Sequence, residues 1–266
     1  MAIPLQFDHA VILVNDLEQA SSDYRTLGFH VFFGGVHADS KTHNSLIVFR
    51  DGTYLELLAP TNPALLDGLD ADDKSSFLFM FARGEGFGGY ALLSSNLESE
   101  VARMQQRGLP IQPRPPGGRA RSDGQALRWR SAMLEGTMTP FFIQDDTARN
   151  LRVPDDPDSI QHPNGVTGVA GIMVAVHGLD AGIMRYSAIL DAAPQQQDAT
   201  TADFALGDRT ISLNAPTQTD EESDLRDYLA QHGEVPYKLW LWSEHGEQAG
   251  TLDNALTHGA HIELMV

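Results

Sequence analysis

Hydrophobic and polar positions near the N-terminus predict a strand followed by a helix. Residues 7–14 (FDHAVILV) are apolar and rich in branched side chains, as in a buried strand. Asp16 is a suitable N-cap, and apolar residues recur at helical spacing from Leu17 to Leu27. Gly28 follows, where a helix would end.

Three further strands are expected directly after this helix. Short apolar runs occupy residues 29–33, 43–49 and 53–59. The last two runs are joined by Arg-Asp-Gly at 50–52, and Asp-Gly between apolar runs is a strong hairpin signal. The segment therefore has βαβββ order, and we refer to such a unit as a module.

The module pattern recurs along the chain. Leu17, Leu97 and Leu179 take the same place in three strand–helix segments, and the final run HIELMV matches only the last strand of a module. A turn-forming HPNG run separates the second copy from the third. We therefore expect two modules over 1–162, and a third module with a truncated fourth over 163–266.

Composition narrows the classes of protein to consider. The chain has 266 residues with 36 acidic and 18 basic side chains, a formal charge of −18 that would repel nucleic acid. It has no cysteine, which excludes disulfides, thiolate metal ligands and a cysteine nucleophile. We see no signal peptide and no run long enough for a membrane span, so we expect a cytoplasmic protein without a membrane partner.

The first module carries residues that suggest a family. His9 lies on its first strand, Thr-His-Asn occupies 42–44, and DGTYLEL at 51–57 includes Glu56. This combination resembles a module of the vicinal oxygen chelate superfamily, which includes glyoxalase I, extradiol dioxygenases and bleomycin-resistance proteins. The closer resemblance is to bacterial glyoxalase-like domain proteins. It implies an α+β fold in which paired modules curl mixed sheets into a cup, with helices outside.

The resemblance also implies a site inside the cup. Family members hold a divalent metal with side chains from the first and last strands of a module, the positions of His9 and Glu56, and such ligands suit Zn, Fe, Mn or Ni. A two-residue hairpin turn would place His43 beside Glu56, whereas a longer turn would bring Asn44 there instead. Glu263 aligns with Glu56 and could supply another ligand. Glu56 is also the first choice for a catalytic general base.

Two functions remain open from the sequence. Positions equivalent to His9 and Glu56 in the second and third modules carry Gly89, Phe142, Gly171 and Ser212, which ligate metals poorly. The leading hypothesis is a metal-dependent lyase, isomerase or dioxygenase that acts on a small oxygenated molecule. An anionic molecule is one option for this substrate. The alternative is a metal-free protein that binds or sequesters a small molecule. A homodimer is compatible with either.

Substrate-binding candidates lie in both of the first two modules. Arg128 and Arg130 alternate around Trp129 in an expected strand, so the two arginines share one face and the indole takes the other. With Asn44, these three residues are the substrate-binding candidates. The GxGxxG run at 84–89 leads into an expected strand rather than a helix, so we expect no nucleotide cofactor.

Overall fold

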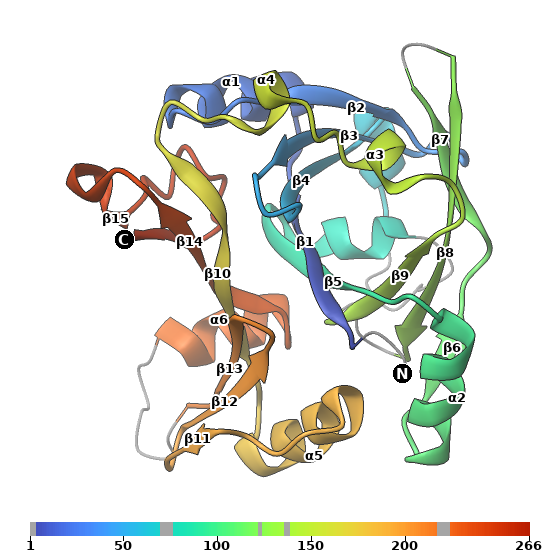
Figure 1. The fold of residues 1–266 in the computed structure, drawn as a ribbon, viewed down its shortest axis with the longest axis vertical. Helices are drawn as coiled ribbons and strands as arrows, with labels where there is room; N and C mark the ends of the chain where they lie inside the picture. The colour runs from blue at the N-terminus through green and yellow to red at the C-terminus, as the bar shows by residue number, and fades with distance from the viewer. Residues whose placement is uncertain (1–3, 70–76, 122–123, 136–138, 217–223) are drawn as a thin grey trace.

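The computed structural model describes residues 4–69, 77–121, 124–135, 139–216 and 224–266, which form two curled mixed sheets (Figure 1). One sheet has nine strands from the N-terminal part of the chain, and the other has seven strands from the C-terminal part. The longer helices cover the outer faces of the sheets, which confirms the predicted fold class.

The first module follows the predicted order. Its elements are β1 (Gln6–Leu13), α1 (Leu17–Thr26), β2 (Phe32–Val36), β3 (Thr42–Val48) and β4 (Tyr54–Pro60). Asp16 caps α1, because its side chain accepts hydrogen bonds from the backbone N–H groups of Glu18 and Gln19. The second strand begins at Phe32, three residues later than the apolar run that predicted it.

The second module completes the nine-stranded sheet. It contains β5 (Gly86–Leu93), α2 (Leu97–Gln106), β6 (Ile111–Pro113), β7 (Gly117–Ala120), β8 (Ala126–Leu134) and β9 (Phe141–Asp145). Before it lie the 3-10 helices η1 (Pro63–Leu66) and η2 (Phe77–Arg83). The GxGxxG run enters β5 and no helix opens on it, so the context of a phosphate-binding loop is missing.

The two modules meet at their first strands and curl around a cup. The strand order is β2-β3-β4-β1-β5-β9-β8-β6, with β7 on β8, and β1 runs antiparallel to β5. Beyond β2, His37 forms a bridge with Arg119, and the Ala38 N–H donates to the Gly118 carbonyl at 2.9 Å. These contacts join the two ends of the sheet and give the cup a nearly closed wall.

The seven-stranded sheet repeats this plan with fewer elements. Two short helices, α3 (Arg149–Arg152) and α4 (Pro157–Ile160), lead to it. It contains β10 (Val166–Ala175), α5 (Leu179–Leu190), β11 (Gln196–Gln197), β12 (Thr201–Leu206), β13 (Arg209–Asn214), α6 (Asp224–His232), β14 (Pro236–Ser243), η3 (Gly246–Gln248), β15 (Gly250–Thr251) and β16 (Ile262–Met265). Residues 254–259, just before the last strand, form a series of turns.

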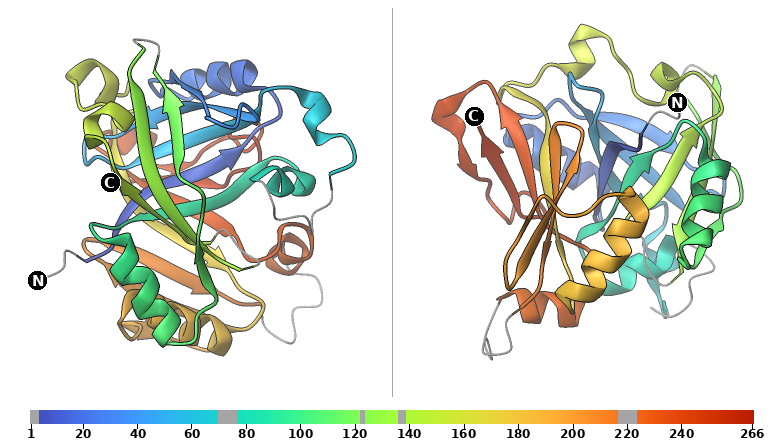
Figure 2. Two further views of the ribbon diagram at one scale, coloured as in Figure 1. Left: turned by 90° about the vertical axis from the view of Figure 1, so that its right-hand side faces the viewer. Right: turned by 60° about the horizontal axis from the view of Figure 1, so that its bottom comes forward.

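The helix-bearing faces of the two sheets share one hydrophobic core. Ile12 on β1 and Ile172 on β10 are fully buried in the same cluster, and the Tyr90 hydroxyl donates to the Tyr186 hydroxyl at 3.0 Å. Helices α2 and α5 lie side by side (Figure 2). Alternation along β1 therefore sends Ile12 into this core and the neighbouring Val11 into the cup. No helix of the described residues is long and apolar enough to cross a membrane.

Candidate functional site

A pocket of about 370 Å³ lies inside the cup of the nine-stranded sheet. Its walls include apolar side chains from both modules, among them Val11, Leu58, Trp129, Phe141 and Ile143. Its polar floor is formed by four side chains from the first module: His9, His37, Asn44 and Glu56. A mostly apolar pocket with a few convergent polar groups is typical of a small-molecule site.

His9 and Glu56 meet on this floor. Strands β1 and β4 are parallel neighbours, and the side chains of His9 and Glu56 point into the cup. The His9 Nε2 atom lies 3.3 Å from Glu56 Oε2, although both residues are at least nine-tenths buried. His9 also stacks on Tyr54, with ring centroids 4.4 Å apart, so its ring orientation is fixed by packing.

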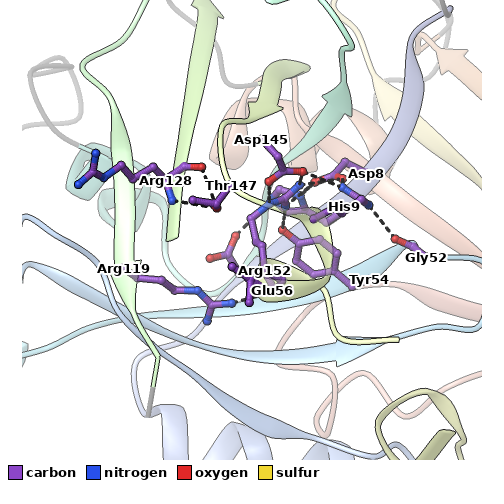
Figure 3. A network of polar contacts seen from close by, with 12 residues as sticks. Asp8, His9, Gly52, Tyr54, Glu56, Arg119, Arg128, Asp145, Thr147 and Arg152 are labelled. Carbon is purple, nitrogen blue, oxygen red and sulfur yellow. Dashed lines mark hydrogen bonds and ion pairs between the residues drawn. The ribbon is translucent and has the colours of Figure 1, made fainter. Parts of the chain in front are cut away.

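A buried ionic network holds the other side of the His9 ring (Figure 3). His9 Nδ1 donates to Asp8 Oδ2 at 2.7 Å, and Asp8 is completely buried. Arg152 from α3 donates to Asp8 at 2.8 Å, to Asp145 at 2.5 Å and to the Tyr54 hydroxyl at 2.6 Å. Arg149 of the same helix also pairs with Asp8, at 2.6 Å, so the connection between the two sheets carries both cations that balance this carboxylate.

This surrounding separates the pKa values of the pair. Burial alone would lower the pKa of His9, but hydrogen bonds and charges from Asp8 and Glu56 outweigh burial and raise it. Burial would raise the pKa of Glu56, but the hydrogen bond and charge of His9, the charge of His37 and the Asn44 amide lower it to about 2. His9 and Glu56 thus each stabilise the charged form of the other.

The β3–β4 hairpin decides which neighbour joins Glu56. Phe49 pairs with Thr53, which leaves a three-residue turn whose last residue, Gly52, has φ of +81°. Leu46 therefore faces Glu56 across the hairpin, and Asn44 lies on the same face, where its amide donates to Glu56 Oε1 at 2.6 Å.

The structure corrects the prediction that a two-residue turn places His43 beside Glu56. With three residues in the turn, His43 points to the opposite face of β3 and does not line the pocket. Its imidazole contacts the exposed Phe33 ring at 6.3 Å edge-on. The longer-turn alternative, with Asn44 turned inward, is the one that the structure contains.

Two pocket residues were missed as site candidates in the sequence. His37 follows β2, and its Nε2 atom lies 3.6 Å from Glu56 Oε1, while Nδ1 lies 2.7 Å from Thr42 Oγ1. Arg119 on β7 is only 6% exposed and donates to Asn44 Oδ1 at 3.2 Å. Neither residue stands out by spacing, because both reach the floor only when β2 and β7 meet.

The remaining predicted residues divide between the pocket and the surface. Trp129 lines the pocket, whereas Arg128 and Arg130 are exposed on the other face of β8, and Arg130 pairs with Asp146 at 2.8 Å. Glu263 lies on β16 of the other sheet, where it faces Lys238 at 3.4 Å. The structure therefore does not bring Glu263, Arg128 or Arg130 to the floor.

The floor does not form a complete metal site. His9, His37 and Glu56 are a donor set that transition metals accept, and Asp8 and Thr42 hold the outer ring nitrogens. However, Glu56 Oε1 already accepts the Asn44 amide at 2.6 Å. Within the part of the chain that the structure describes, no group of three or more His, Asp or Glu side chains is arranged to hold an ion.

Comparison with known families supports the resemblance seen in the sequence. A family model described as a glyoxalase-like domain matches residues 7–190. This span covers both modules of the nine-stranded sheet, β10 and α5. A search among curated proteins finds no match.

Solved structures share the fold at low sequence identity. A hypothetical protein from Staphylococcus aureus superposes with a TM-score of 0.78 and 14% identity, over 98% of this chain and 99% of that one. A triple mutant of 4-hydroxymandelate synthase from Streptomyces coelicolor superposes with a TM-score of 0.60 and 16% identity, over 95% of this chain and 78% of that one. A fusion protein of a xylose isomerase-like TIM barrel and 4-hydroxyphenylpyruvate dioxygenase superposes with a TM-score of 0.57 and 13% identity. The match covers 94% of this chain and 40% of that one.

Proposed function

Because the chain belongs to the glyoxalase-like domain family of the vicinal oxygen chelate superfamily, we propose that it is an enzyme that moves a proton on a small oxygenated molecule. The observation that carries the proposal is the His9–Glu56 pair, 3.3 Å apart at the floor of a mostly apolar pocket. Two titratable groups whose surroundings push their pKa values apart are a common sign of an acid and a base.

In this proposal Glu56 is the base and His9 is the acid. The Glu56 carboxylate accepts a proton from a carbon next to a carbonyl, and the His9 imidazolium gives its Nε2 proton to the carbonyl oxygen. The product is an enol, which can return the proton to a different position. Asp8 keeps the ring oriented through its hydrogen bond to Nδ1.

The low pKa of Glu56 is compatible with this role. In the structure the pKa of Glu56 is lowered largely by the hydrogen bond and charge of His9. A carbonyl oxygen that enters between the two side chains takes over the His9 donor. Glu56 then loses part of its stabilisation, so its pKa rises and it becomes a stronger base.

Proton exchange with solvent tests the proposal directly. Small ketones, 2-hydroxy aldehydes and 2-oxo acids are incubated with the protein in D₂O, and loss of the signal next to the carbonyl is followed by proton NMR. We expect exchange with at least one compound, reduced roughly 10²–10⁴-fold in Glu56→Gln and His9→Asn. Binding of these compounds without any exchange would instead support a binding or sequestration protein.

A metal-dependent reaction is a second candidate, favoured by one observation. The Nε2 atoms of His9 and His37 both face the Glu56 carboxylate, at 3.3 and 3.6 Å. A divalent ion such as Zn²⁺ or Fe²⁺ would require Asn44 to release Oε1. Metal analysis of the protein and its His9→Ala variant separates this candidate from the first.

A further inference from the structure

Basic residues outnumber acidic ones in the pocket lining, whereas acidic residues outnumber basic ones in the whole chain. The chain has twice as many acidic as basic residues, 36 against 18. The pocket lining instead includes four basic residues, Lys41, Arg114, Arg119 and Arg152, against two acidic ones, Asp39 and Glu56, although Asp8 and Asp145 outside the lining balance Arg152. A basic wall in an acidic protein would attract an anion to this pocket and away from the rest of the surface.

Arg119 differs from the other buried arginine of the pocket. Arg152 is balanced by Asp8 and Asp145, at 2.8 and 2.5 Å. Arg119 donates only to neutral oxygens, Asn44 Oδ1 at 3.2 Å and the Arg152 carbonyl at 3.0 Å. Among the described residues no carboxylate forms an ion pair with it, although it is 6% exposed. Glu56 acts on Arg119 through its charge but without a direct ion pair, so a ligand anion in contact with the guanidinium would stabilise this buried cation.

The guanidinium of Arg119 fits against the backbone at Gly34, which has no side chain to occupy that space. A Cβ atom on Gly34 would lie 2.2 Å from Arg119 Nη1 and 2.3 Å from Asn44 Oδ1, so any side chain there would displace the pair. A guanidinium carries five N–H donors, of which the two bonds to Asn44 and Arg152 use two. The other three donors form no further hydrogen bond within the described residues, and Arg119 lines the pocket.

We propose that Arg119 binds the carboxylate of the substrate, and that the substrate is a small carboxylate with an apolar body. The planar guanidinium fork matches a carboxylate in shape and charge. The inference rests on the proposed function for the reaction that follows binding.

The size and walls of the pocket fit such a molecule. The apolar side chains of Trp129, Phe141 and Ile143 face the cavity. Its volume of about 370 Å³ exceeds the roughly 150 Å³ of a cavity that holds benzene, so a ring and a short polar arm both fit.

Asn44 links this anion site to the acid–base pair. Its Oδ1 atom accepts from Arg119 and its Nδ2 atom donates to Glu56, so one amide group separates the two. A carboxylate on Arg119 therefore has its neighbouring carbons beside the Glu56 carboxylate and His9. The anion site would thus orient the substrate for the proton transfer.

Matched ligands test the proposal without knowledge of the natural substrate. Phenylacetate and its neutral counterpart phenylacetamide are titrated into ¹⁵N-tryptophan-labelled protein, and the indole N–H signal of Trp129, identified with Trp129→Phe, reports binding. We expect roughly ten- to hundred-fold tighter binding of the carboxylate. Phenyl phosphate is the third ligand, and tighter binding of it than of phenylacetate would overturn the carboxylate assignment.

Variants locate the preference on Arg119. Arg119→Met should bring the two affinities to about equal, Arg119→Lys should retain only part of the preference, and Gly34→Ala should weaken it by displacing the guanidinium. Arg128→Met removes the same charge from the exposed face of β8 and should change nothing.

Glu56→Gln separates this proposal from the proposed function. It should abolish proton exchange but keep the preference for the carboxylate. An unchanged preference in Arg119→Met, or equal affinities of carboxylate and amide in the wild-type protein, would overturn the role of Arg119.

Discussion

His9 and Glu56 approach within 3.3 Å although they are not register partners on their strands. In the β1–β4 ladder His9 pairs with Tyr54, and Glu56 pairs with Val11, two residues further along β1. The His9 ring stacks on Tyr54 and reaches along the strand direction to the carboxylate. The contact therefore depends on side-chain packing as well as on the parallel pairing of the strands.

Removing the carboxylate should change the titration of His9. We expect Glu56→Gln to lower the pKa of the His9 imidazole, because Glu56 contributes both a hydrogen bond and a charge that favour the protonated ring. An NMR titration of the imidazole carbons measures it. Glu263→Gln, in the other sheet, should leave the His9 titration unchanged, and an equal shift in both variants would contradict the assignment.

The Asp8–Arg152 pair should be important for stability. Both side chains are at most 3% exposed, so removing one partner leaves a buried charge with fewer counter-charges. We expect Asp8→Asn or Arg152→Met to lower the free energy of unfolding by about 3 kcal/mol or more. In urea unfolding the double variant should lose less than the sum of the single losses. Additive losses would show that the two side chains act independently.

His162 should make the protein less stable in mild acid. Burial lowers the pKa of His162 to about 4, below its ordinary value of 6.5, and its Nδ1 atom accepts from the His30 N–H at 2.9 Å. The unfolded chain therefore binds the proton more readily between these pH values, so stability is complete above pH 6.5 and falls as the pH falls.

Unfolding at two pH values measures this contribution. Between pH 7 and pH 5 the His162 share of the lost free energy should be about 2 kcal/mol. Between these pH values the unfolding free energy of His162→Asn should fall by less than that of the wild-type protein, and the difference should equal the His162 share. His177 is exposed, so His177→Asn is the matched control. If His162→Asn loses as much unfolding free energy between pH 7 and pH 5 as this control, the prediction is contradicted.

Metal uptake should depend on the floor of the pocket. We expect any Zn²⁺ or Fe²⁺ that the wild-type protein retains to be lost in His9→Ala, because Nε2 is the ring nitrogen facing Glu56. His43→Ala should retain it, since His43 points away from the pocket. Elemental analysis after dialysis measures both, and equal metal content in His9→Ala and the wild-type protein would remove His9 from the metal proposal.

Much of the fold could be predicted from local pattern. Apolar strands, the Asp16 cap and the repeated leucines at 17, 97 and 179 are properties of short segments, and each segment forms the expected element. The same local pattern placed His9 on the first strand of its module and Glu56 on the last. Since the first and last strands of this module are parallel neighbours, these two positions were enough to bring the side chains together.

Only the tertiary structure decided the rest of the site. One additional residue in the hairpin turn exchanges His43 for Asn44, because strand side chains alternate with a period of two. His37, Arg119 and Arg152 lie on separate elements and reach the pocket through the bridge between His37 and Arg119 and through the contact of α3 with Asp8 on β1. Such contacts join residues up to 144 positions apart, as for Asp8 and Arg152, and local periodicity holds no information about them.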